Sequence, residues 1–273
     1  MSHPATGASA RSYPPRPQAV YFYGTCLVDM LVPEAGLDAI TLLEQEGIRV
    51  IFPDNQTCCG QPALTSGFPG EARQVVASQL DLFPCDYPIV VPSGSCGGMI
   101  RWHWEKVVAD DPALKAKAAA IAARTYELAE FLLHVVGFNR PDQGPATTVT
   151  LHTSCSARRE MGTHLAGREL LARLGNVTLA HHDHESECCG FGGTFSLKHP
   201  DVSTAMVSDK VAALKATGAQ QMVTADCGCM LNITRHAAWQ DQNAGAGKPS
   251  LQGEHLATFL LRRLGGQPAG EQR

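Results

Sequence analysis

Eight of the ten cysteines form two copies of one four-thiol pattern. In each copy a single cysteine follows an apolar run, an adjacent cysteine pair precedes a glycine, and another single cysteine ends the pattern. The second copy lies about 130 residues after the first, which indicates an internal duplication. The two sets are Cys26, Cys58, Cys59 and Cys96, and Cys155, Cys188, Cys189 and Cys229. Thiols repeated at these spacings predict metal binding.

The donor type narrows the choice of metal. Adjacent cysteines such as Cys58 and Cys59 form a disulfide only with strain, which disfavours that alternative. Zinc usually takes cysteine pairs separated by two to four residues, so a structural zinc protein stays open as an alternative that fits less well. Soft thiolates without histidine or carboxylate in the repeated pattern favour an iron–sulfur cluster, of the 4Fe-4S type, with one or two per chain.

The elements around these cysteines predict their position. Apolar runs that read as strands precede every patterned cysteine or pair, at residues 19–24, 48–52, 89–91, 147–152, 177–181 and 221–225. Helices are expected at 37–46, 71–82, 159–174 and 202–217, and a long helical region is expected to include 113–123 and to reach 137. Alternating strands and helices predict an α/β fold of two pseudo-repeated βαβ-type halves with parallel sheets. The clusters are then expected at the carboxyl ends of the strands.

Composition sets limits on organisation and partners. An apolar content of 44% suits a buried core, and a net charge of −4 gives no basic surface for nucleic acid or membrane. We find no apolar run of membrane-spanning length and no signal-peptide pattern, so we expect a cytoplasmic protein with reduced thiols. The predicted divisions are a disordered tail 1–18, a first cysteine-rich half 19–138, a linker 139–146, a second half 147–265 and a flexible C-terminus 266–273.

Several residues outside the thiol pattern are candidates for a role at the site. Gly60, Gly190, Gly192 and Gly193 are predicted to bring backbone N–H groups close to an anionic cluster, since no nucleotide-binding motif is present. The loop 181–185 reads as a solvated polar loop, in which His182 and His184 remain candidates for contact with a cluster. Cys227 is a candidate additional ligand, whereas Cys85 is expected to be structural. The run Trp102 to Trp104 is either core or a partner-facing patch.

The doubled frame resembles the cysteine-rich CCG domain found in heterodisulfide reductases and in glycolate- and lactate-oxidising complexes. The likeness covers residues 19–265 and is strongest to the lactate utilization protein A group. It is carried by the stretches 58–63, 92–96, 188–196, 225–229 and 231–232. The resemblance implies that the cysteines ligate iron–sulfur clusters, and that the chain works in a complex oxidising L-lactate to pyruvate, or a similar 2-hydroxy acid. It also implies partner subunits, including a ferredoxin-like iron–sulfur protein.

The chain departs from the heterodisulfide reductase pattern at one position in each half. That pattern has a fifth cysteine three residues after the last one, where this chain has Met99 and Asn232. Four thiolates per half can still hold an ordinary cluster. A thiol/disulfide redox subunit like heterodisulfide reductase therefore stays open as an alternative. No flavin or nicotinamide motif is present, so hydride chemistry is expected on another chain.

Overall fold

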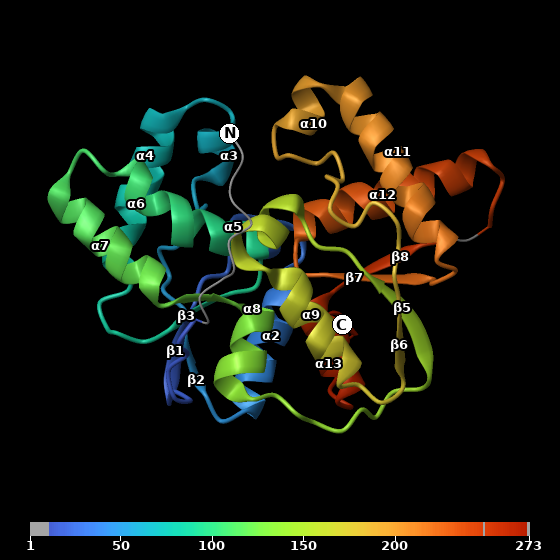
Figure 1. Cartoon of the computed structure of the whole chain (residues 1–273), viewed down its shortest axis with the longest axis horizontal. Helices are drawn as coiled ribbons and strands as arrows, with labels where there is room; N and C mark the ends of the chain where they lie inside the picture. The colour runs from blue at the N-terminus through green and yellow to red at the C-terminus, as the bar shows by residue number, and fades with distance from the viewer. Residues whose placement is uncertain (1–10, 248, 272–273) are drawn as a thin grey trace.

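Two four-stranded parallel sheets, one in each half, organise the structure (Figure 1). The computed structural model describes residues 11–247 and 249–271. The first sheet has the order β2-β1-β3-β4, and the second has the order β6-β5-β7-β8. Their strands are β1 (Ala19–Phe22), β2 (Arg49–Ile51), β3 (Ile89–Val91) and β4 (Thr125–Glu127), then β5 (Thr147–Leu151), β6 (Val177–Ala180), β7 (Gln221–Thr224) and β8 (Gln252–His255). The predicted α/β class, parallel sheets and pseudo-repeat are confirmed.

Helices connect consecutive strands, as parallel pairing requires. Those of the first half are α1 (Cys26–Leu31), α2 (Pro33–Gln45), α3 (Gln61–Thr65), α4 (Pro69–Gln79), α5 (Gly94–Gly98), α6 (Trp104–Val107), α7 (Pro112–Ala123) and α8 (Leu128–Phe131). Those of the second are α9 (Thr163–Ala172), α10 (Phe195–Lys198), α11 (Pro200–Ala216), α12 (Cys227–Asn243) and α13 (Leu256–Arg263). Short 3-10 turns are η1 (Leu80–Leu82) and η5 (Ala269–Glu271), and π turns are η2 (Met99–His103), η3 (Leu132–Val136) and η4 (Ala157–Met161). Within the described residues, none of the helices has the length and apolarity needed to span a bilayer.

The fourth strand of each sheet was not predicted. The stretch before Gly137 was expected to be helical throughout, yet β4 interrupts it and pairs with β3 in the register Ile89↔Thr125. The second sheet gains β8 in the same way, in the register Gln221↔Gln252. Strands of three or four residues are too short for hydrophobic periodicity to identify. Pairing with a distant strand determines their conformation.

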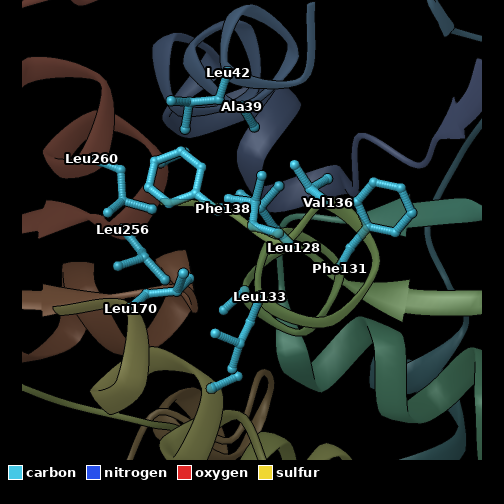
Figure 2. Packing of buried hydrophobic residues seen from close by; sticks show 14 of the residues in the cluster. Ala39, Leu42, Leu128, Phe131, Leu133, Val136, Phe138, Leu170, Leu256 and Leu260 are labelled. Carbon is cyan, nitrogen blue, oxygen red and sulfur yellow. The ribbon is translucent and has the colours of Figure 1, made fainter. Parts of the chain in front are cut away.

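The two halves share one apolar core (Figure 2). It lies between the sheets, where α2 of the first half packs against α13 of the second. Figure 2 shows side chains from both helices converging on Phe138, which is 2% exposed. The labelled members are Ala39, Leu42, Leu128, Phe131, Leu133, Val136, Phe138, Leu170, Leu256 and Leu260. A continuous core fixes the orientation of one half relative to the other.

The described parts of the predicted tail, linker and C-terminus pack onto this core. Residues 1–10 and 272–273 lie outside the described residues. The expectation of disorder does not hold for residues 11–18, because Arg11 forms a 2.7 Å ion pair with Glu130 and Tyr13 stacks on His134. In the linker, Asp142 forms a buried 2.6 Å ion pair with Arg263. Towards the C-terminus, the backbone N–H of Ala269 donates to Asp38 Oδ1 at 2.8 Å.

Candidate metal centre

The four thiols of the first half converge at the carboxyl ends of β1, β2 and β3. Cys26 is the first residue of α1, Cys96 lies in the first turn of α5, and the pair Cys58-Cys59 lies between β2 and α3. The Cys26 thiol hydrogen-bonds to Cys58, Cys58 also contacts Cys59, and Cys59 contacts Cys96. None of these cysteines is in a disulfide. The first half therefore presents four adjacent free sulfur donors.

The second half repeats this arrangement. Cys155 follows β5, Cys188 and Cys189 follow β6, and Cys229 lies in the first turn of α12 after β7. The thiol contacts run in the same sequence, from Cys155 to Cys188, then to Cys189 and to Cys229. All four are free thiols.

Both sets of thiols open into one cavity of about 540 Å³. Its lining contains all eight patterned cysteines, together with Cys227, Met99, Asp226 and the pair His103 and Glu160. Cys227, the candidate additional ligand, thus lines the same cavity as the patterned cysteines. Cys85 is exposed and is not among the lining residues. The two four-thiol sets consequently face a common space, a relationship that the sequence repeat does not reveal.

The halves contact each other around this cavity through two equivalent pairs of elements. The turn η4, which follows Cys155, packs on α5 of the first half, and α1 packs on α12 of the second. The close approach depends on Gly94, where a Cβ would lie 2.5 Å from the Cβ of Ala157. The first cysteine of each half is therefore held by the helix that carries the last cysteine of the other half.

Glycine geometry places backbone donors at one sulfur of each set. Gly60 has φ +87°, and its N–H donates to Cys58 Sγ at 3.4 Å. Gly190 has φ +82°, and its N–H donates to Cys188 Sγ at 3.4 Å. Both conformations are in the left-handed region that favours glycine. Gly192 and Gly193 also line the cavity.

These contacts favour the thiolate at the first cysteine of each pair. Hydrogen bonds from Cys26, then from Cys59 and the backbone, lower the pKa of Cys58 to about 3. Hydrogen bonds from Cys155, then from Cys189 and the backbone, lower the pKa of Cys188 to about 2. An anionic sulfur surrounded by further thiols is the state that binds a metal cation.

Different side chains hold the second cysteine of each pair. The indole N–H of Trp104 donates to the Cys59 carbonyl at 2.9 Å, and the amide of Asn232 donates to the Cys189 carbonyl at the same distance. Met99 is buried and lines the cavity, whereas Asn232 is not among the lining residues. Of the two residues at the fifth-cysteine positions, Met99 alone faces the thiols.

The comparisons with known proteins agree with this geometry. Residues 20–101 and 149–234 match the family model described as a cysteine-rich domain, CCG. Lactate utilization protein A of Bacillus subtilis (strain 168) is 38% identical over 224 residues, which are 82% of this chain and 94% of that protein. Lactate utilization protein A of Geobacillus kaustophilus (strain HTA426) is 39% identical over 245 residues, 89% and 99% of the two chains. The chain belongs to the CCG family, among the lactate utilization A proteins.

A solved structure shares the fold of this CCG protein. A hypothetical protein from Helicobacter pylori matches with a TM-score of 0.69 at 11% identity. The match covers 96% of this chain and 53% of the other, so the chain spans about half of that protein's length. At this level of identity the likeness concerns the fold alone.

The two CCG halves differ at a histidine that sequence reasoning missed. His152 is fully buried, and neither ring nitrogen has a hydrogen-bond partner among the described residues. A ring nitrogen of His152 and the sulfurs of Cys189 and Cys229 lie within 4.8 Å of one another. Burial, then the charge of Lys210, lowers the pKa of His152 to about 3, so the ring is neutral. The sequence did contain a signal for this histidine, because it lies three residues before Cys155, the first cysteine of the second half.

The expectation of a solvated loop at 181–185 is wrong for one of its histidines. His182 is 6% exposed, and its Nδ1 lies 2.6 Å from the Asp183 carbonyl. His184 is exposed and pairs with Glu187 at 2.7 Å. The histidine run therefore splits between the interior and the surface.

Of the two tryptophans after Cys96, which were expected in the core or in a partner-facing patch, one is in the core and the other is at the surface. Trp104 is fully buried, whereas Trp102 is 46% exposed and its indole donates to the Glu160 carbonyl at 2.8 Å. Both rings thus hold elements around the cavity, Trp104 at the cysteine pair and Trp102 at η4.

Proposed function

We propose that this chain is the iron–sulfur subunit of a cytoplasmic redox complex that oxidises L-lactate to pyruvate, or a similar 2-hydroxy acid. The observation that carries the proposal is the convergence of two free four-thiol sets on one cavity. The names of the relatives connect the family with lactate utilization. A cluster bound by thiolates transfers single electrons with little change of geometry.

The donors suit 4Fe-4S clusters, one in each half. In the first half Cys26, Cys58, Cys59 and Cys96 would supply four soft thiolates, which iron–sulfur clusters prefer. The corresponding four cysteines of the second half would supply the same number. The free thiol state of all ten cysteines fits a reducing compartment, where such clusters persist.

The lining of the cavity supports a division of labour with partner subunits. Its residues include neither lysine nor arginine, and the one imidazole, His103, is paired with Glu160 at 2.7 Å. A 2-hydroxy-acid carboxylate is held most strongly by a charge-assisted hydrogen bond from a cation, whereas this lining supplies only uncharged donors such as Gln61, Ser93 and Ser156. We therefore propose that the hydroxy acid binds to another subunit. This chain would receive electrons and pass them on, with a ferredoxin-like iron–sulfur protein as a partner.

Metal analysis of the isolated chain tests the proposal. Anaerobic purification should yield a brown protein with iron and acid-labile sulfide, and an electron paramagnetic resonance signal after reduction. Two clusters predict about eight iron atoms per chain, and one cluster about four. Colourless protein with stoichiometric zinc would overturn the proposal in favour of the structural zinc alternative. Assay of lactate oxidation then requires the complex with its partners.

The shared cavity also favours a second candidate, reduction of a disulfide. An uncharged disulfide needs no cation, and a cavity of about 540 Å³ reaches both thiol sets. Such a reaction consumes two electrons and two protons per disulfide, and yields two thiols. Incubation of reduced, cluster-loaded chain with an organic disulfide separates the two functions. Stoichiometric release of thiol would favour this candidate, and an unchanged disulfide would exclude it.

A further inference from the structure

The two halves differ in the residue that stands three positions before their first cysteine. In the first half this residue is Tyr23, whose hydroxyl donates to the Thr57 carbonyl at 2.9 Å. In the second half it is His152, whose two ring nitrogens have no partner in the described part of the chain. Both side chains are fully buried behind the thiols. The two halves thus have equivalent thiols but differ at this position, where only the second half has a side chain, His152, that commonly binds metal.

An unpartnered buried imidazole requires an explanation. A neutral ring carries one N–H donor and one lone pair, and burial without partners for either is unfavourable. One ring nitrogen lies near two sulfurs, since it and the sulfurs of Cys189 and Cys229 lie within 4.8 Å of one another. Some iron–sulfur centres bind histidine nitrogen as well as thiolate, so a nitrogen this close to two ligand sulfurs is a donor that the same centre can take.

We propose that His152 is a nitrogen ligand of the metal centre in the second half, in place of one of its four thiolates, which gives this centre mixed cysteine and histidine coordination while the first remains all-thiolate. The inference rests on the proposed function, because it requires a cluster in the second half. Replacement of thiolate by imidazole raises the reduction potential of an iron–sulfur centre. The two centres should therefore have different potentials, with the higher one at His152.

The test observes the second centre alone. The double variant Cys58→Ser, Cys59→Ser removes two of the four thiols of the first set and so prevents cluster binding there. The protein is then loaded anaerobically, reduced and examined by pulsed electron paramagnetic resonance. We expect a strong ¹⁴N hyperfine coupling that changes when the histidines are labelled with ¹⁵N. In this background His152→Tyr, which copies the first half, and His152→Gln should both abolish the coupling. His199→Gln, at an exposed histidine of the same half, should leave it unchanged.

The results distinguish failure of the ligand assignment from failure of the proposed function. Iron and sulfide bound by the double variant, without strong coupling to a histidine nitrogen, would overturn the ligand assignment and leave the proposed function intact. A weak coupling alone would also overturn it, because it indicates a hydrogen bond instead of a bond to iron. A double variant that binds no iron would overturn both the second cluster and the role of His152. Circular dichroism establishes that each variant is folded.

Discussion

The carboxylate of Asp226 accepts a 3.0 Å hydrogen bond from Ser93 Oγ across the boundary between the two halves. The same oxygen accepts the backbone N–H of Ser95, at the start of the helix that carries Cys96. Asp226 itself precedes the helix that carries Cys229. One buried side chain therefore joins the helices of the two thiol sets.

Loss of this junction should destabilise the apo-protein. Asp226→Ala leaves two donors of the first half, Ser93 Oγ and the Ser95 N–H, without their acceptor. We expect the free energy of unfolding to fall by about 1–3 kcal/mol, measured by urea denaturation. Asp110→Ala, which removes an exposed ion pair with Arg73, is the control and should cost less than about 1 kcal/mol. An equal effect of the two substitutions would contradict the structural role of Asp226.

Substitution of one patterned cysteine should remove one cluster. Cys58→Ser deletes the thiolate that contacts Cys26 and Cys59, so we expect the iron content to fall to about half that of the unmodified protein. Cys188→Ser should have the same effect through the second half. Cys85→Ser is the control, since Cys85 is exposed and away from the cavity lining, and should leave iron unchanged. Equal iron loss in all three variants would refute the ligand assignment.

Met99 should not be required for cluster binding. Its side chain lines the cavity, yet a thioether is a weaker ligand than the four thiolates of its half. We expect Met99→Leu, which keeps the volume and removes the sulfur, to retain the full iron content and an unchanged electron paramagnetic resonance spectrum. A loss of iron or an altered spectrum would identify the thioether as a fifth donor of the first half.

Glu127 should contribute stability to the apo-protein that is lost as pH rises. Its side chain accepts the N–H groups of Ala129 and Glu130, and burial raises its pKa from 4.5 to about 8. A carboxyl whose pKa is higher in the folded state contributes fully below pH 4.5 and loses this contribution as pH rises through about 8. The loss is about 5 kcal/mol between these limits.

Glu127→Gln isolates this contribution. Glutamine preserves the acceptor for the two N–H groups but cannot ionise, so the unfolding free energy measured in urea at about pH 8.5, relative to that at about pH 5, should be higher in the variant than in the unmodified protein. Glu105→Gln, at a half-exposed glutamate, should retain the slope of the unmodified protein. An unchanged slope in Glu127→Gln would show that another group is responsible.

Sequence reasoning located the thiols on the correct elements because the signal is local. A strand of apolar residues followed by a cysteine identifies both the element and the edge of the sheet, as at Ile89–Val91 before Cys96. The short strands at Thr125–Glu127 and Gln252–His255 were missed because neighbouring strands, and not their own residues, stabilise them. The domain boundaries at 138 and 147 remain a prediction.

The common cavity could not be inferred from the repeat. It depends on contacts between segments far apart in the chain, such as Gly94 against Ala157 and Asp226 against Ser93. His152 was missed because it is a residue at which the two halves differ. Comparison of the two halves emphasises what they share, and Tyr23 occupies the matching position in the first half.

The two equivalent contacts between the halves bear on the origin of the fold. The contacts of η4 on α5 and of α1 on α12 are the two equivalent contacts expected of a symmetric homodimer. Fusion of two copies into one chain keeps that interface but ends the requirement that both sides carry the same residues. One ancestral site can then drift towards a new ligand set while its twin keeps the old one.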